Sequence, residues 1–397
     1  MRGGQGVNAA MQLSYRSDQA SAGHDRTRQD MDSPIQDAEV VRRGAELAEL
    51  GRQLARLGLS PEKVLTFTGA LSLGDLSRAI DDTARRASKL PRPRGLGALI
   101  ALLCCGLAQS AAELEAVLGA PALALLEAVG VLERAGADLV PRLALVPAQR
   151  RLGARAGGAV GPVVLVAHDL HRLRFESLAV MAPDLSSELM LRASITRAGS
   201  WLDVGTGSGV VALAAALRGT PRVIAADLNP RAGAFVRLGA ALNGVAGAVT
   251  ALESDLMQAV PPGRHDVITF NSPLLFGMGD LLWRNTAEGP ALLRRFFDDL
   301  APRLAGEALI HAQLPHDERV LPARVPMTDP ARFHGLSLRY ELGEEWAQGL
   351  LWLTPAGGGR AIWVEELHEP TPEQLFLDRE QLEIALARNE MRSPVAT

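Results

Sequence analysis

The sequence has few aromatic residues, almost no cysteine and almost no lysine, and each shortage narrows what the protein can be. Aromatic residues make up 4% of the 397 residues and hydrophobic residues 47%, so Ala, Leu and Val must build most of the core. The two cysteines, Cys104 and Cys105, are neighbours in an apolar run, where we expect a helix to bury them. Two cysteines exclude a disulfide framework and a four-cysteine zinc site, and they fit a reducing, cytoplasmic compartment.

A strong charge of one sign and a long hydrophobic run are also missing. The formal net charge is -4, and Lys63 and Lys89 are the only lysines, so a nucleic-acid partner is disfavoured. The longest apolar stretch, from Gly95 to Ala108, is shorter than the roughly 20 residues that span a bilayer. We therefore expect no membrane span, and the first residues contain no apolar region typical of a secretory signal.

The N-terminal part of the chain is predicted to form an arm and then a helical domain. Residues 1–35 lack apolar periodicity, which predicts a disordered arm. The helical domain covers residues 36–150, with helices predicted over 37–57, from Ser60-Pro61-Glu62, and over 96–107, 111–118 and 121–132, and a strand pair over 137–146. Three helices followed by a hairpin are the outline of a winged-helix domain, so a nucleic-acid reader has to be considered.

The charges of this domain disfavour base recognition. The segment 121–132, which would be the recognition helix, contains no Lys or Arg, whereas contacts to bases or phosphates need hydrogen-bond donors there. Packing, homodimerisation or covering of a substrate fits this apolar segment better.

A different pattern begins after a linker over 150–161. A strand is predicted over 163–166 and a helix from Ser186, and apolar strands over 201–204, 222–226, 249–252, 266–270 and 308–312 then alternate with helical stretches. This alternation predicts a doubly wound α/β domain, which we assign to residues 162–370. Later strands are predicted over 334–342, 350–353 and 361–365, and residues 371–397 are predicted to form a C-terminal helix, over 372–389, and tail.

A glycine-rich loop joins the first strand of this domain to its helix. The segment Asp203-Val204-Gly205-Thr206-Gly207-Ser208-Gly209 has a glycine at every second position, which permits a tight turn and a close approach of a ligand to the backbone. A dinucleotide fingerprint would place its third glycine three residues after the second, and here the interval is two, so a nucleotide-dependent oxidoreductase is disfavoured.

This loop, in its order of strand, acid, alternating glycines and helix, resembles motif I of class I S-adenosylmethionine-dependent methyltransferases. The resemblance implies a Rossmann-like fold and S-adenosylmethionine as the cofactor. It also implies that Asp203, Gly205, Thr206, Gly207 and Gly209 hold the methionine part of that cofactor.

Acidic residues follow the next two strands. Asp227, followed by Leu228 and Asn229, stands at the end of a strand, where a carboxylate can bind both ribose hydroxyls; the alternative is a helix cap. Asp255, followed by Leu256, comes after the third strand. The resemblance implies that this acid contacts the adenine amino group, and the alternative is a solvated loop acid.

The fourth strand ends in Asn271-Ser272-Pro273-Leu274, which resembles the Asn-Pro-Pro-aromatic motif of methyltransferases that act on amino or amide nitrogens. The resemblance implies that the Asn271 side-chain oxygen and a neighbouring backbone carbonyl, at Ser272 or Pro273, accept hydrogens from the target nitrogen. The chemistry is a displacement at a sulfonium, in which orientation matters more than a strong base. The sequence departs from the motif at Ser272 and Leu274, and Phe276 could replace the missing aromatic ring.

Other side chains lie near these motifs in the sequence. Ser186 or Ser187 could contact the cofactor or could only cap a helix. Trp283 and Arg284 could line the acceptor site or could be packing and solvent contacts.

Four histidines stand at positions where they could bind a metal or move a proton. His168 and His171 have the spacing of two metal ligands, but no third ligand is evident, so surface histidines are the favoured interpretation and no metal is expected. His311 and His316 lie at and after the end of a strand, and either could accept a proton from an oxygen nucleophile.

The predicted function is S-adenosylmethionine-dependent methylation of an amide or amine nitrogen in a protein or a small molecule. The alternatives are a methyltransferase that acts on oxygen or carbon, and a non-catalytic regulator that binds S-adenosylmethionine and uses the helical domain as its output.

Overall fold

The computed structural model describes residues 33–70, 73–87, 91–149, 161–174, 176–193, 198–273, 289–315, 333–342 and 346–355. Residues from Ser33 onward belong to one compact unit. Most of the arm predicted over 1–35, the linker over 150–160, the strand over 361–365 and the C-terminal helix over 372–389 lie outside the described residues. The end predicted for the arm was wrong, because residues 33–35 are described and Ile35 is buried in the hydrophobic core.

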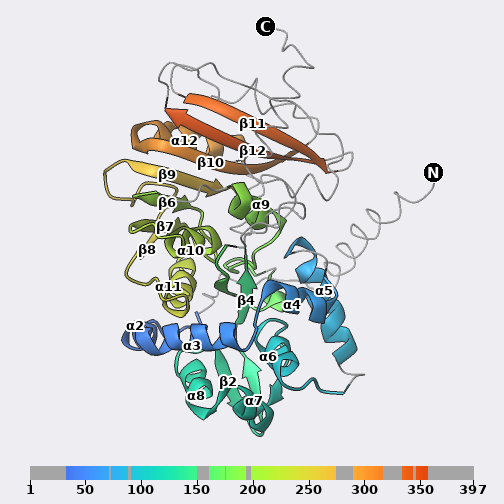
Figure 1. Ribbon diagram of the computed structural model, residues 1–397. Helices are drawn as coiled ribbons and strands as arrows, with labels where there is room; N and C mark the ends of the chain where they lie inside the picture. Colours follow the sequence, from blue (N-terminus) through green and yellow to red (C-terminus); the bar gives the residue numbers. More distant parts are fainter. Residues whose placement is uncertain are drawn as a thin grey trace, which may run out of the picture. The chain divides into compact units, whose positions relative to one another are not determined.

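A seven-stranded sheet forms the centre of the C-terminal part, in the order β11-β12-β10-β9-β6-β7-β8 (Figure 1). The strands are β6 (Trp201–Val204), β7 (Val223–Asp227), β8 (Val249–Glu253), β9 (His265–Asn271), β10 (Leu304–Pro315), β11 (Phe333–Leu342) and β12 (Trp346–Pro355). Strands β6 to β10 run parallel, whereas β12 pairs antiparallel with β10 and with β11. The strand order reverses between β6 and β9, which is the switch point of the sheet, and the predicted Rossmann-like sheet is confirmed.

Helices cover both faces of this sheet. Successive side chains of each strand point to opposite faces, so both faces carry apolar residues that need to be buried. Helices α10 (Val210–Leu217) and α11 (Ala232–Leu242) share one core with Val223 and Ala225 of β7. Helix α12 (Gly289–Arg303) shares the other core with Ala226 of β7. The period of two along β7 therefore sends neighbouring residues into different cores. Helix α9 (Leu185–Ala193) packs beside α10 and the ends of β9 and β10.

The helical part precedes the sheet. It contains α2 (Asp37–Arg42), α3 (Gly44–Arg56), α4 (Pro61–Thr68), α5 (Leu73–Ala87), α6 (Leu96–Leu103), β1 (Gln109–Ser110), α7 (Ala111–Leu118), α8 (Ala120–Ala128), β2 (Leu132–Ala135) and β3 (Asp138–Pro141). The predicted start of α4 is confirmed, since Pro61 occupies its first turn and the Ser60 hydroxyl accepts the Lys63 N–H. The helix predicted over 37–57 is two helices, with Arg43 outside helical geometry between them.

Two predictions in this part were wrong. Helix α8 ends at Ala128 and not at Leu132, because Gly130 takes a φ of +82° and packs against the Pro34 carbonyl, after which β2 begins. Helix α6 likewise ends at Leu103, before residue 107.

The strand pair predicted over 137–146 was also wrong. Strand β3 pairs with β2 and β1, whereas β4 (Ala144–Ala148) pairs with β5 (Val164–His168). The turn lies at Gly136, between β2 and β3, because glycine accepts the positive φ of 64° found there. The three helices and the three-stranded sheet β1-β3-β2 are compatible with a winged helix, which stays a prediction.

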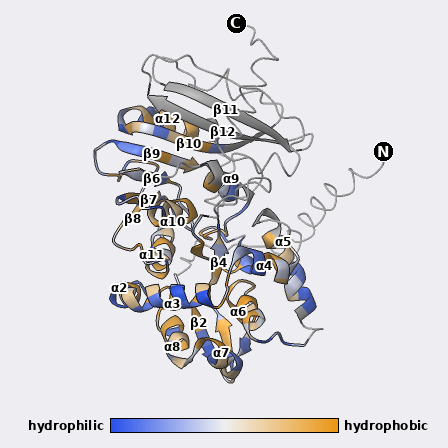
Figure 2. Ribbon diagram, in the orientation of Figure 1, coloured by the Kyte–Doolittle hydropathy of each residue, from blue (hydrophilic) through white to orange (hydrophobic). Residues whose placement is uncertain are grey.

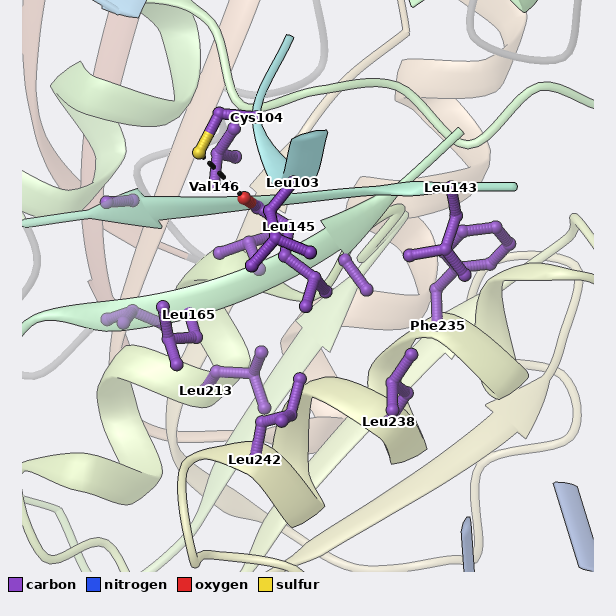
Figure 3. Close-up of a cluster of buried hydrophobic side chains, with 14 of the residues drawn as sticks. Leu103, Cys104, Leu143, Leu145, Val146, Leu165, Leu213, Phe235, Leu238 and Leu242 are labelled. Carbon is purple, nitrogen blue, oxygen red and sulfur yellow. Dashed lines mark hydrogen bonds between the residues drawn. The ribbon is translucent and has the colours of Figure 1, made fainter. Parts of the chain in front are cut away.

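The helical part and the sheet share one hydrophobic core. Figure 3 shows Leu145 of β4 near Leu165 of β5, above Leu213 of α10 and Leu242 of α11, and all four residues belong to one buried cluster. The Cys104 thiol is buried and donates to the Leu145 carbonyl at 3.1 Å, as expected for a core cysteine. Helix α6 is coloured hydrophobic in Figure 2, but within the described residues no helix is long and apolar enough to cross a membrane.

Candidate donor and acceptor site

A cavity of about 300 Å³ opens at the carboxyl ends of the central strands, at the switch point between β6 and β9. The residues predicted from sequence that line it are Asp203, Gly205, Thr206, Gly207, Asp227, Leu228, Asn229, Asp255, Leu256, Asn271, Ser272 and Pro273. The fold therefore brings together twelve residues that come from the ends of four strands. Gly209 does not line the cavity.

Each of the three glycines of the loop has a backbone conformation that favours a residue without a side chain. Gly205, Gly207 and Gly209 have φ values of 62°, 53° and 80°, a region that other residues rarely adopt. A Cβ atom on Gly209 would lie 2.9 Å from Val236 Cγ2 on α11. Gly209 thus allows α10 to begin close to α11, which is a packing role, while the cofactor contact that the resemblance implies for Gly209 stays a prediction.

Asp203 anchors the loop from inside the sheet. Its carboxylate accepts hydrogen bonds from the Thr206 hydroxyl at 2.7 Å and the Thr269 hydroxyl at 2.6 Å, and from the Ala212 N–H at the start of α10. Burial nevertheless raises the pKa of Asp203 to about 6, because these hydrogen bonds only partly offset the loss of solvent. The group can therefore change its charge near neutral pH.

Asp227 connects the ends of β6 and β7. One carboxylate oxygen accepts the Gly207 N–H at 2.6 Å and the other accepts the Asn229 N–H at 2.8 Å, so the acid fixes the glycine loop. Burial raises the pKa of Asp227. Asp227 does not cap α11, whose first turn starts after Arg231. Leu228 beside it is 52% exposed and lines the cavity.

Asp255 and Leu256 follow β8 at the same end of the sheet. Asp255 forms an ion pair with Arg295 of α12 and accepts a hydrogen bond from Gln258, so it is not only a solvated loop acid. Leu256 is the non-glycine residue with a positive φ, 50°, among the described residues, and its side chain is buried. Backbone strain of this kind is common next to ligand sites.

Asn271 ends β9 with its amide held from two sides. The Asn271 Nδ2 donates to Ser186 Oγ at 2.8 Å, and His311 Nδ1 lies 2.9 Å from Asn271 Oδ1. Because an amide oxygen only accepts, His311 carries its proton on Nδ1. The His311 carbonyl also accepts the Ser272 N–H at 2.9 Å, since β10 and β9 pair in register here.

Both Ser186 and Ser187 line the cavity, but neither caps the helix. The cap of α9 is Asp184, whose carboxylate accepts the Ser187 N–H at 3.0 Å. Ser272 Oγ, which is buried, has no hydrogen-bond partner within the described residues. Leu274, Phe276, Trp283, Arg284 and His316 lie outside them.

The surface position predicted for two histidines was wrong. His168 is 1% exposed, its Nδ1 donates to the Asp169 carbonyl at 2.7 Å, and burial lowers its pKa to about 4. His171 lies 3.3 Å from Asp81 with a buried side chain. In the described residues no three potential metal ligands come together.

Sequence reasoning missed one pair of residues near the cavity. Asp169 and Arg231 form a buried ion pair behind the cavity wall, at 2.6 and 2.8 Å. No local pattern predicts it, because the two residues stand far apart in the sequence and meet only when β5 packs against α11.

The electrostatic character of the cavity suits a positively charged ligand. Four carboxylates line it, those of Asp184, Asp203, Asp227 and Asp255, and none of its lining residues in the described part of the chain is Lys or Arg. The sulfonium of S-adenosylmethionine is a cation, so the residues present fit this donor.

A family model described as "Methyltransferase small domain" matches residues 179–295, which include all the residues that line this cavity except His311. The chain contains a class I methyltransferase domain. The cofactor of this methyltransferase domain is S-adenosylmethionine, and its strand order is the Rossmann-like arrangement described above.

Curated relatives match parts of the methyltransferase domain. A "Ribosomal protein L11 methyltransferase" of Pelotomaculum thermopropionicum is 42% identical over 21% of this chain and 26% of its own length. A "Putative protein N5-glutamine methyltransferase" of Methanocaldococcus jannaschii is 38% identical over 19% of this chain and 36% of its own. The chain thus spans about a quarter to a third of the length of these relatives.

Among solved structures, that of "ribosomal protein L11 methylase" from Lactobacillus delbrueckii subsp. bulgaricus is 18% identical. The alignment covers 42% of this chain and 76% of that structure, with a TM-score of 0.28. The fold of the methyltransferase domain is therefore assigned from the strand order of the present structure.

Proposed function

We propose that this protein is an S-adenosylmethionine-dependent methyltransferase that methylates a nitrogen, an amide or an amine, of a protein or a small molecule. The bound donor supplies an electrophilic methyl group. The acceptor nitrogen must then be held in line with that methyl, which needs orientation more than a strong base.

The fixed amide of Asn271 is the observation that carries this proposal. Its oxygen has two lone pairs, of which the His311 N–H uses one, so the other can accept a hydrogen from the target nitrogen. The buried Ser272 hydroxyl lines the same cavity and offers a second polar contact for the acceptor. Asn271, Ser272 and the Pro273 carbonyl are accordingly the proposed acceptor-binding and catalytic residues.

The donor is assigned to the other end of the cavity. The glycine loop with Asp203 and Thr206 is proposed to hold its methionine part, and Asp227 its ribose. Asp255 is proposed to hold the adenine amino group, with Leu228 and Leu256 against the ring.

A protein acceptor is favoured by the names of the two relatives, which specify ribosomal protein L11 and a protein glutamine. A nucleic-acid acceptor is disfavoured, because α8 carries no basic residue and no Lys or Arg is among the described residues that line the cavity. We also propose a cytoplasmic location, on the basis of the two free, buried cysteines, and we keep a homodimer through the helical part as a further prediction.

An oxygen acceptor is the alternative, because His311 lines the cavity and could take part in proton transfer. A non-catalytic regulator is the second alternative, in which the fixed amide of Asn271 would have no chemical task.

The first test is calorimetric titration of the full-length protein with S-adenosylmethionine, S-adenosylhomocysteine and NAD. Binding of the first two and not of NAD is expected, and binding of NAD alone would contradict the proposal. A second step uses the donor with a labelled methyl group and pools of peptides that contain glutamine, lysine or a free terminal amine, with oligoribonucleotides as a separate pool. Acid-stable label on a peptide nitrogen supports the proposal, and label on RNA or on a hydroxyl overturns its acceptor class.

A further inference from the structure

The ion pair of Asp169 and Arg231 is buried on both sides and makes two parallel hydrogen bonds. Arg231 donates through one guanidinium nitrogen at 2.6 Å and through the other at 2.8 Å, and the two residues are 4% and 5% exposed. A buried pair of this kind adds little net stability, because the loss of hydration offsets the attraction between the charges. The pair is instead important for the backbone segment to which it is hydrogen-bonded.

The pair holds the segment from Leu178 to Val180. The Leu178 carbonyl accepts from Arg231 at 2.9 Å and from the Asn229 amide at 3.0 Å. The Val180 N–H donates to the Asp169 carboxylate at 2.8 Å, and the Val180 carbonyl accepts the Asp169 N–H at 3.0 Å. The backbone of the segment is thus fixed at both of its ends.

This segment is a wall of the donor cavity. Ala179 and Val180 line it directly, together with the loop residues that end β6 and β7. Arg231 lies only a few residues after Asp227, the proposed ribose contact. Because this segment is hydrogen-bonded to Arg231 and Asn229, its position is fixed relative to the turn that is proposed to bind the donor.

Asp169 also connects this wall to the helical part of the molecule. It follows β5, and β5 pairs antiparallel with β4, from Ala144↔His168 to Ala148↔Val164. The strand that carries Asp169 to the cavity is thus aligned by a strand from outside the match to the methyltransferase family model.

We propose that Asp169 and Arg231 are positioning residues for the methyl donor, and that through them strand β4 of the helical part, which pairs with β5, contributes to donor affinity. The two residues do not touch the donor and act through the Leu178–Val180 wall. This inference rests on the proposed function, since it takes the cavity to be the donor site.

The test compares donor affinity with global stability. In the double variant Asp169→Leu/Arg231→Met both charges disappear together, so no unpaired charge is left in the interior. The variant loses the hydrogen bond from the Arg231 side chain to the Leu178 carbonyl and the one from the Val180 N–H to the Asp169 carboxylate. We expect its Kd for S-adenosylhomocysteine, measured by calorimetry, to rise at least about tenfold while its Tm stays within a few degrees of the wild type. Arg231→Lys keeps the charge but not the double hydrogen bond, so its Kd should be intermediate between that of the wild type and that of the double variant.

The matched control is the ion pair of Asp37 and Arg237. Arg237 lies on the same helix, α11, but this pair is about 40% exposed and does not line the cavity. Asp37→Asn/Arg237→Gln should leave the Kd unchanged.

A folded double variant with wild-type affinity overturns the inference. If that variant fails to fold, Arg231→Lys decides in its place, and wild-type affinity there overturns the inference too. Hydrogen exchange of the Val180 amide without ligand is the second measurement, and it should be faster in the variants. If the wild type binds neither S-adenosylmethionine nor S-adenosylhomocysteine, the proposed function fails. The exchange measurement is independent of that result, and equal exchange rates of the Val180 amide in the wild type and the variants would show that the pair does not restrain the Leu178–Val180 segment.

Discussion

Asp203 is a buried carboxylate at the edge of a cavity that suits a cation, and its protonation should control donor binding. Burial raises its pKa to about 6, so it is mainly neutral at pH 5 and mainly ionised at pH 7. A cationic donor favours the ionised form. The site therefore gains affinity as the pH rises through 6 and loses it as the pH falls.

We expect the Kd for S-adenosylmethionine to be about tenfold weaker at pH 5 than at pH 7, because pH 5 lies about one unit below the pKa. Titration calorimetry at half-unit intervals measures this. Asp203→Asn should flatten the profile in part, since burial also raises the pKa of Asp227 and that acid acts in the same direction. A wild-type Kd that is constant from pH 5 to pH 7 would contradict the prediction.

Asn271 should matter for transfer and much less for donor affinity. Its amide is oriented by Ser186 and His311, and no other described amide side chain lines the cavity at the end of β9. We expect Asn271→Ala to lower the single-turnover rate of methyl transfer by about 10²- to 10³-fold, the size typical for loss of one oriented polar group. The Kd for S-adenosylhomocysteine should change by less than about threefold.

Gln53→Ala is the control for this substitution, because it removes an amide that bonds the Leu118 carbonyl in the helical part and does not line the cavity. Equal transfer rates for the wild type and Asn271→Ala would remove Asn271 from the mechanism.

At the scale of elements, the packing of α3 on α11 depends on one glycine. A Cβ atom on Gly51 would lie 1.9 Å from the carbonyl oxygen of Leu242, so the two helices touch backbone to backbone. An alanine in the middle of a helix normally stabilises it by about 0.5 to 1 kcal/mol relative to glycine. Here the clash with a backbone atom outweighs that gain, because neither helix can yield without moving.

We expect Gly51→Ala to lower the free energy of unfolding by about 1 to 3 kcal/mol, the usual range for an overpacked core. Gly44→Ala, in the same helix α3 but with no atom within 4 Å of the position that its Cβ would take, should be neutral or slightly stabilising. Urea unfolding followed by circular dichroism compares the two variants. Equal stabilities would show that α3 does not rest on α11.

At the scale of the whole molecule, the methyltransferase domain is not expected to fold without the helical part. The two share the larger hydrophobic core, and β5 loses its only described partner strand when β4 is removed. A chain that starts at residue 161 would expose Leu165, Leu238 and Leu242, which the helical part helps to bury.

Such a fragment should lack a cooperative thermal transition and should bind a hydrophobic dye, whereas the full chain should unfold cooperatively and leave the dye unbound. Differential scanning calorimetry and dye fluorescence measure these properties. A cooperative transition in the fragment would show that the sheet has an independent core.

The prediction of the parallel sheet from sequence succeeded because its strands are short apolar runs that alternate with helices. The ranges predicted for β6 and α7 agree with the structure to the residue, and those for β7, β8 and β9 differ by at most one residue at either end. Strand β2 was not predicted, and β3 and β4 were wrongly paired with each other, because the pairing of β3 with β1 and of β4 with β5 depends on partners distant in the sequence.

The order of strand, glycine loop and acid follows from the amino-acid sequence, and so does the set of residues at the carboxyl edge of the sheet. These are local properties, since hydrophobic period and backbone freedom act over a few residues. The partners of those residues follow only from the packing of distant segments. His311 meets Asn271 because β10 lies beside β9, Gly209 serves packing because α11 lies over it, and Asp169 meets Arg231 because β5 docks on α11. Contacts between distant segments depend on how whole faces fit together, and a single sequence does not record that fit.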